Sequence, residues 1–166
     1  MQVRIEEAYP GDLALGFDFA TSARDGRNKR EIPAHWQQVE AGNMLATLPG
    51  RAGAAVYVGV VHAFDNATLD FNYLIGVLAD ADTVVPAGCR SVALPAGRYA
   101  VLTTTPTSNQ GDFVAGIQQG WQWLMAEWLP ESGYRAADTP SFERYDEPSA
   151  PGQSGRTMAI WMPLQS

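Results

Sequence analysis

Cysteine is nearly missing from this 166-residue chain, which contains only Cys89. A single cysteine cannot form an internal disulfide, so we expect a reducing compartment and predict a cytoplasmic location. With only two histidines in addition, a zinc site is not expected. The first residues, MQVRIEEAYPG, lack the features of a signal peptide. No apolar run reaches the length of a membrane span, so we expect no membrane partner.

Basic residues are also scarce, with 11 Lys and Arg against 18 Asp and Glu and a net charge of −7. Binding to a phosphate backbone depends on Lys and Arg, so direct nucleic-acid binding is not expected. Hydrophobic residues make up 46% of the chain and charged residues 17%, which is typical of a folded globular domain.

Recognisable catalytic or cofactor motifs are absent as well. No glycine-rich phosphate loop follows a strand, and Asp80 and Asp82 lack the spacing of a calcium loop. His35 and His62 match no catalytic motif, and we predict that they are surface or helix-cap histidines. We therefore predict no metal and no cofactor.

A weak internal repeat runs through the chain. AYPGDLALGF, which begins at Ala8, aligns with ALPAGRYAVL, which begins 85 residues later at Ala93. The same spacing aligns IPAHWQQV with IQQGWQWL, YVGV with FERY, and YLIGV with MAIWM. Strand falls on strand and helix on helix each time. We therefore predict a tandem duplication within a single domain, residues 1–166, with halves of about 1–80 and 86–166.

Each half reads as a β-α-β-β unit. Residues 13–21 and 99–105 have the pattern of strands, and polar loops follow them, TSARDGRNKRE in the first half and PTSNQGD in the second. The hairpins pair AAVYVGVVHAF with DFNYLIGVLA, and SFERYDEP with TMAIWMPL; residues 80–92 link the halves. The predicted class is α+β, with a ligand groove between the two halves.

One helix is predicted in each half. The first spans residues 33–44 and ends near Gly42 or Asn43. The second begins after Asp112 as N-cap and is stopped by Pro130 and Gly133. Its apolar face carries Phe113, Ile117, Trp121, Leu124 and Trp128 at helical spacing.

The segment TPSFERYDEP, residues 139–148, places a carboxylate inside a short strand. Because side chains alternate along a strand, Glu143 and Tyr145 share one face, while Phe142 and Arg144 share the other. The residues alone leave two interpretations open. Glu143 either lies on a solvated surface, paired with a base such as Arg144, or lies in a pocket for a positively charged ligand.

The second half resembles the GyrI-like effector-binding domain family, chiefly through AEWLPESGY together with SFERYD. The first half fits through IPAHW, YVGV and FNYLIGV, so the resemblance covers nearly the whole chain. It implies an α+β fold with a curved antiparallel sheet and two long helices. It also implies an aromatic-lined cleft for lipophilic cations beside a buried glutamate. By its place in the FE-x-Y pattern, that glutamate is Glu143, with Tyr145 on the same face.

Aromatic residues of the paired elements are the predicted walls of this cleft: Tyr57, Tyr73, Phe71, Trp121, Trp36 and Trp161. A stripe of aromatic residues at helical spacing is also typical of a core helix, so core packing stays open for Trp121 and Trp128.

Three functions are consistent with the resemblance. The leading prediction is a stand-alone effector-binding module for lipophilic, cationic or aromatic compounds, because the chain begins at the sensing domain and leaves no residues for a DNA-binding module. The second is a hydrolase of strained, cyclopropane-bearing electrophiles, with Glu143 activating water and Tyr145 donating a hydrogen bond. The third is binding to a protein partner, either a regulator or gyrase. The sequence indicates neither the native ligand nor the oligomeric state.

Overall fold

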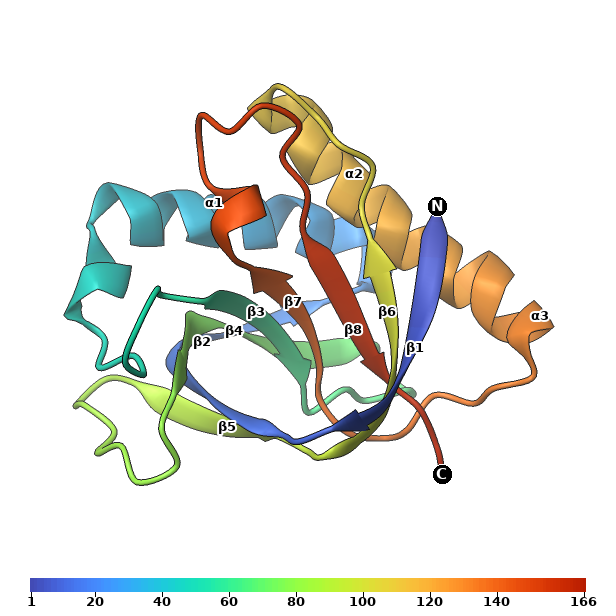
Figure 1. The fold of residues 1–166 in the computed structure, drawn as a ribbon, viewed down its shortest axis with the longest axis horizontal. Helices are drawn as coiled ribbons and strands as arrows, with labels where there is room; N and C mark the ends of the chain where they lie inside the picture. Colours follow the sequence, from blue (N-terminus) through green and yellow to red (C-terminus); the bar gives the residue numbers. More distant parts are fainter. The chain divides into compact units, whose positions relative to one another are not determined.

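The structure is a computed structural model that describes residues 1–166, and its internal contacts divide the chain into two units. Unit 1 consists of Met1–Gly11 and Pro95–Ser166, and unit 2 of Asp12–Leu94. Each unit contains four antiparallel strands and one long helix (Figure 1). The predicted α+β class, with antiparallel strands and two long helices, is confirmed.

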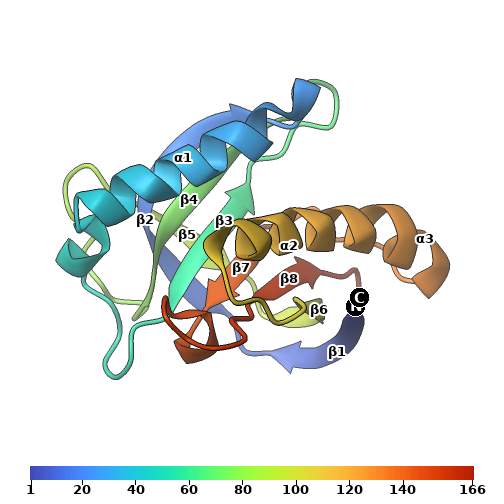
Figure 2. The same ribbon diagram turned by 90° about the horizontal axis from the view of Figure 1, so that it is seen from above.

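Unit 2 has the strand order β3-β4-β2-β5. Its strands are β2 (Asp12–Ser22), β3 (Tyr57–His62), β4 (Asp70–Ala79) and β5 (Arg90–Leu94). Its long helix is α1 (Arg27–Ala41), flanked by the 3-10 turns η1 (Arg24–Gly26) and η2 (Met44–Thr47). Helix α1 lies across one face of β2 and β4, as Figure 2 shows.

Unit 1 has the strand order β1-β6-β8-β7. Its strands are β1 (Gln2–Tyr9), β6 (Gly97–Thr103), β7 (Ser141–Tyr145) and β8 (Ala159–Pro163). Helix α2 (Gln110–Trp123) continues through one π-helical segment, η3 (Leu124–Trp128), into α3 (Leu129–Ser132); a 3-10 turn, η4 (Glu147–Ser149), follows β7. None of the helices is both long and apolar enough to cross a bilayer.

The two units share one connectivity. The runs β2-α1-β3-β4 and β6-α2-β7-β8 each form three neighbouring strands and a helix. The fourth strand of each unit does not pair with the strand that follows it in the sequence. Strand β1 precedes β2 but pairs with β6. Strand β5 precedes β6 but pairs with β2. Residues 80–92, predicted as a link, therefore contain the start of β5. The common connectivity is what a duplication would produce, and the duplication remains a prediction.

The predicted start of the first helix was wrong. Helix α1 begins at Arg27, inside the segment that we predicted as a polar loop, and Pro33 lies within the helix. We had placed Pro33 in the first turn, where proline is most common, and the preceding basic run offers no side-chain cap. The predicted end is confirmed, because Gly42 is the C-cap residue.

Two details of the second helix also differ from the prediction. The N-cap is Asn109, not Asp112: the Asn109 Oδ1 atom accepts a hydrogen bond from the Asp112 backbone N–H at 2.9 Å. Pro130 does not stop the helix, which ends only before Gly133, whose φ of 77° is left-handed.

The sheet of unit 1 has two different faces. Glu143 pairs with Ile160 and Phe142 with Trp161, so alternation puts these two pairs on opposite faces. Ile160 packs with Leu102, Phe113 and Leu124 in the core under α2. On the other face, Trp161 and Phe142 pack with Tyr9 and Tyr99, with ring centroids 5.1–5.9 Å apart.

In unit 2, two glycines allow β2 and β4 to pair closely. Gly16 faces Gly76 across the ladder, and a Cβ at Gly16 would overlap the Ile75 carbonyl oxygen and the Gly76 Cα. We expect Gly16→Ala to lower the free energy of unfolding by about 2–4 kcal/mol, because the two backbones must separate. Gly116→Ala is the control, because its Cβ would contact nothing within 4 Å. Equal urea-denaturation midpoints for Gly16→Ala and the wild type would contradict the prediction.

Burial of Tyr99 predicts a dependence of stability on alkaline pH. Its side chain is buried and donates to the Pro95 carbonyl at 2.8 Å, and burial raises the pKa of Tyr99 to about 12. The folded pKa is higher than the unfolded one, so this stability is fully present below pH 10 and is lost as the pH rises towards 12. Between these values the free energy of unfolding should fall by about 1.4 kcal/mol per pH unit more in the wild type than in Tyr99→Phe. Parallel denaturation curves for the two proteins from pH 9 to 12 would contradict this.

Candidate functional site

Glu143 is buried between β7 and α2, with 5% of its surface exposed. Its Oε1 atom accepts a hydrogen bond from Trp121 Nε1 at 2.8 Å, and its Oε2 atom accepts one from the Tyr145 hydroxyl at 2.6 Å. Helix and strand therefore each supply one aromatic donor to the same carboxylate. Hydrogen bonds to a charged acceptor are among the stronger ones in proteins and stabilise its ionised form.

Gly120 explains how the helix comes close enough for this contact. A Cβ at Gly120 would lie 3.0 Å from Ile160 Cδ1 and 3.1 Å from Leu102 Cδ2, closer than most side chains tolerate. Glycine therefore allows α2 to lie directly on the sheet beside the row that contains Ile160 and Glu143. The next residue along the helix, Trp121, can then reach the carboxylate with its indole N–H.

The surroundings of the carboxylate are mainly apolar. Trp121 and Tyr145 pack against the core of unit 1, whose buried members are Ala100, Leu102, Phe113, Leu124, Met158, Ile160, Met162 and Leu164. Phe113 lies next to Tyr145, with ring centroids 6.4 Å apart. Trp121 therefore both packs in the core and donates a hydrogen bond to Glu143. Trp128 packs on the same core and stacks on the ring of Tyr134.

The surface interpretation of Glu143 was wrong. Its proposed partner, Arg144, points to the other face of β7 and lies 3.6 Å from Asp146 Oδ2. The predicted common face of Glu143 and Tyr145 is confirmed by their hydrogen bond.

The structure does not bring Trp161 to this carboxylate. Trp161 lies on the face of the unit 1 sheet that is turned away from α2, and 7% of its surface is exposed. The Arg4 guanidinium lies 5.3 Å from its ring centroid. Trp161 therefore belongs to the aromatic cluster of that face, with Tyr9, Tyr99 and Phe142.

The other four predicted wall residues belong to unit 2. Trp36 on α1 donates its indole N–H to the Tyr73 hydroxyl at 3.0 Å, and Phe71 packs in the same cluster. Tyr57, at the start of β3, is 37% exposed. Trp36 corresponds to Trp121 at the spacing of 85 residues, so the two matched tryptophans both bind a polar group on the sheet of their own unit.

Unit 2 also contains a partly buried polar cluster that the sequence did not indicate. Asp18 Oδ1 lies 2.8 Å from His62 Nε2, and Asp18 Oδ2 accepts from Asn72 Nδ2 at 2.8 Å and from Arg90 Nη1 at 3.2 Å. Each of the four strands supplies one of these residues. His62 is buried, so the interpretation of a surface histidine was wrong. No spacing motif connects four residues from four strands, which is why only the folded sheet reveals the cluster.

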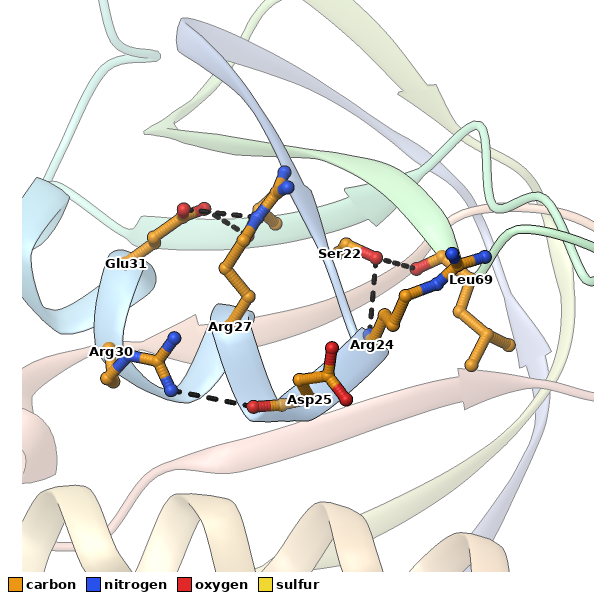
Figure 3. Close-up of polar contacts among 8 residues, drawn as sticks. Ser22, Arg24, Asp25, Arg27, Arg30, Glu31 and Leu69 are labelled. Atoms are coloured by element: carbon orange, nitrogen blue, oxygen red, sulfur yellow. Dashed lines mark hydrogen bonds and ion pairs between the residues drawn. The ribbon is translucent and has the colours of Figure 1, made fainter.

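A hollow of about 370 Å³ opens at one end of the unit 2 sheet. Its lining is Ala20, Thr21, Arg27, Ala63, Asp65, Thr68, Asp70, Phe71 and Asn72. Figure 3 shows the start of α1 beside it, where Arg27 pairs with Glu31 and the Ser22 hydroxyl donates to the Leu69 carbonyl. This hollow is open and polar, in contrast to the surroundings of Glu143.

Hydroxyl groups around this hollow keep two carboxylates charged. The Thr21 hydroxyl, which donates to Glu31 at 2.7 Å, lowers the pKa of Glu31, and Arg27 contributes in the same direction. The Ser22 and Thr68 hydroxyls lower the pKa of Asp70. Both groups are solvent-exposed, so this end of unit 2 has a hydrated, charged surface.

Among the predicted site residues, Glu143, Trp121 and Tyr145 form the arrangement with the clearest chemical consequence. An ionised carboxylate in apolar surroundings, bordered by aromatic rings, would attract a cation that is itself poorly hydrated. The same carboxylate would be a poor site for a hydrated metal ion, because two of its acceptor positions are occupied by ring donors.

Comparison with known proteins gives relatives in sequence and in fold. A protein of Erwinia billingiae named DNA gyrase inhibitor is 35% identical over 91 residues, which are 54% of this chain and 55% of that protein. The chain therefore matches only about half the length of this relative. YobU of Bacillus subtilis, named as a transcriptional regulator protein, is 25% identical over 131 residues, 78% of each chain. The solved structure of SAV2435 bound to tetraphenylphosphonium has a TM-score of 0.78, with 16% identity over 100% of this chain and 95% of that one.

The family match covers more of the chain than the two sequence relatives do. The model of the Cass2 family, described as integron-associated effector binding protein, matches residues 4–164. The resemblance to GyrI-like effector-binding domains is confirmed by this match. This chain belongs to the family of integron-associated effector binding proteins.

Proposed function

We propose that this effector-binding domain binds lipophilic organic cations with delocalised charge, and that Glu143 is the group that attracts them. The observation that supports this most directly is the buried carboxylate whose two oxygens accept hydrogen bonds from Trp121 and Tyr145. The two hydrogen bonds fix the carboxyl group in place, and rings from both the helix and the strand border it. A ligand that combines positive charge with apolar surface matches both features.

The physical chemistry favours poorly hydrated cations over small ammonium ions. A small cation loses strong hydration when it enters apolar surroundings, and that cost offsets its attraction to the carboxylate. A bulky aromatic cation has little hydration to lose and buries apolar surface at about 25 cal/mol per Å². Each ring face that contacts the cation adds about 0.5–2 kcal/mol. The relative of similar fold that was solved with tetraphenylphosphonium supports the use of this cation as a probe.

The two other predicted functions are less well supported. A hydrolase requires Glu143 to contact a water molecule as a general base. Both oxygens of the buried carboxylate already accept hydrogen bonds from ring donors, which leaves fewer acceptor positions for a water molecule. A gyrase-binding role rests on the name of a relative that the chain matches over about half its length. We therefore propose ligand binding.

The charge of Glu143 is tested by Glu143→Gln, which keeps the shape and removes the charge. We expect the affinity for tetraphenylphosphonium, measured by isothermal titration calorimetry, to fall at least about tenfold, because the attraction between opposite charges is lost. Glu127→Gln is the matched control, since it removes an exposed carboxylate of the same unit and should change affinity less than about twofold. A wild-type protein that binds no lipophilic cation, or equal affinities for Glu143→Gln and the wild type, would contradict the proposal.

The donors to Glu143 are tested by Trp121→Phe and Tyr145→Phe, which remove one hydrogen bond each and keep a ring. We expect each to lower the free energy of unfolding by about 1.5–3 kcal/mol, the range for hydrogen bonds to charged groups. The effect should be smaller in the Glu143→Gln background, measured as a double-mutant cycle by urea denaturation. Trp36→Phe removes an indole bond to a neutral hydroxyl and serves as the control. Additive effects, with no coupling to Glu143, would show that these donors do not hold the carboxylate.

A further inference from the structure

Arg156 is anchored beside the first turn of α2. Its guanidinium carbon lies 3.9 Å from the centroid of the Phe113 ring, which is the geometry of a close cation–π contact. Its Nε donates to the Ser149 carbonyl at 3.0 Å, and its Nη1 donates to Gln110 Oε1 at 2.7 Å. Its backbone exchanges two hydrogen bonds with Thr107. The positive charge is therefore fixed in position and does not move freely in solvent.

Phe113 connects this guanidinium to the carboxylate site. The ring is 5% exposed, packs in the core under α2, and lies 6.4 Å from the ring of Tyr145. Tyr145 in turn donates to Glu143. A short row of contacts therefore runs from Arg156 through two rings to the negative charge, all of it within unit 1.

Two consequences follow for a ligand at Glu143. The guanidinium already covers one face of Phe113, so a ligand cannot use that face for a cation–π contact. The fixed positive charge also repels a positive ligand, and the repulsion is stronger in partly buried surroundings than in water. For a given position, the repulsive energy is proportional to the charge of the ligand. A neutral ligand is unaffected and a dication is repelled twice as strongly as a monocation.

We propose that Arg156 is a specificity-determining residue of the Glu143 site, a built-in cation that lowers the affinity for a ligand in proportion to the positive charge of that ligand. This inference rests on the proposed binding of lipophilic cations. The carboxylate attracts positive charge, and Arg156 limits how much positive charge is accepted. Arg156 therefore lowers the affinity for a dication more than the affinity for a monocation of similar chemistry.

The test uses three probes that share phenyl-phosphorus chemistry and differ in charge. They are the neutral triphenylphosphine oxide, the monocation tetraphenylphosphonium, and the dication ethylene-bridged bis(triphenylphosphonium). Affinities are measured by calorimetry for the wild type and for Arg156→Gln. We expect no change for the neutral probe, about threefold tighter binding of the monocation, and about tenfold tighter binding of the dication. Arg156→Lys keeps the charge and should keep the wild-type order of affinities.

Arg4→Gln is the matched control, because it also removes a guanidinium from an aromatic ring of unit 1, on the opposite face of the sheet. It should leave the three affinities unchanged. If Arg156→Gln does not fold, Arg156→Met provides a second neutral side chain that still covers Phe113.

The outcomes separate this inference from the proposed function. A gain in affinity on Arg156→Gln that increases with the charge of the probe supports the role of Arg156. An equal change in affinity for all three probes, or no change in affinity, overturns the role of Arg156. Cation binding that depends on Glu143 would still stand. A wild-type protein that binds none of the cations overturns both.

Discussion

A single buried carboxylate defines the chemistry of unit 1. Glu143 is held from one side by an indole N–H of the helix and from the other by a phenolic O–H of its own strand. Burial of a charge is unfavourable unless hydrogen bonds compensate for the lost hydration. The two aromatic donors provide this compensation for the ionised carboxylate and fix its position among apolar side chains. The close approach of α2 at Gly120 makes the arrangement possible.

The two units show that one connectivity can support different chemistry. Trp121 and Trp36 are matched at the predicted spacing of 85 residues, and each donates its indole N–H to a polar group on its own sheet. In unit 1 that group is a carboxylate, and in unit 2 it is the hydroxyl of Tyr73. The residue of unit 2 that corresponds to Glu143 is the buried Val58, so the negative charge has no counterpart there.

The sequence predicted much of the fold because its strongest signals are local. The strands around residues 13–21 and 99–105 and the apolar face of α2 follow patterns of two and 3.6 residues, and these were confirmed. The start of α1 was missed because Pro33 and a run of basic residues look like a helix boundary, whereas packing of Trp36 and Val39 extends the helix over both. The pairing of β1 with β6 and of β5 with β2 was not predicted, because pairing between segments that are distant in the sequence leaves no local pattern.

The candidate site was predictable in part for the same reason. Glu143 and Tyr145 are two residues apart on a strand, so their common face follows from alternation. The contact with Trp121 depends on how the helix lies on the sheet, and the separation of Trp161 depends on the register of β7 and β8. The Asp18 cluster needs all four strands of unit 2 in place. No local sequence pattern predicts that the residues of this cluster come together.

The central claim concerns the sign of the charge that the site accepts. Tetraphenylphosphonium and tetraphenylborate have nearly the same size and shape and carry opposite charges, so comparing their affinities isolates electrostatics from apolar contact. A fixed carboxylate predicts binding of the phosphonium at least about a hundredfold tighter than of the borate, since one ion is attracted and the other repelled. Equal affinities, or tighter binding of the borate, would contradict the account.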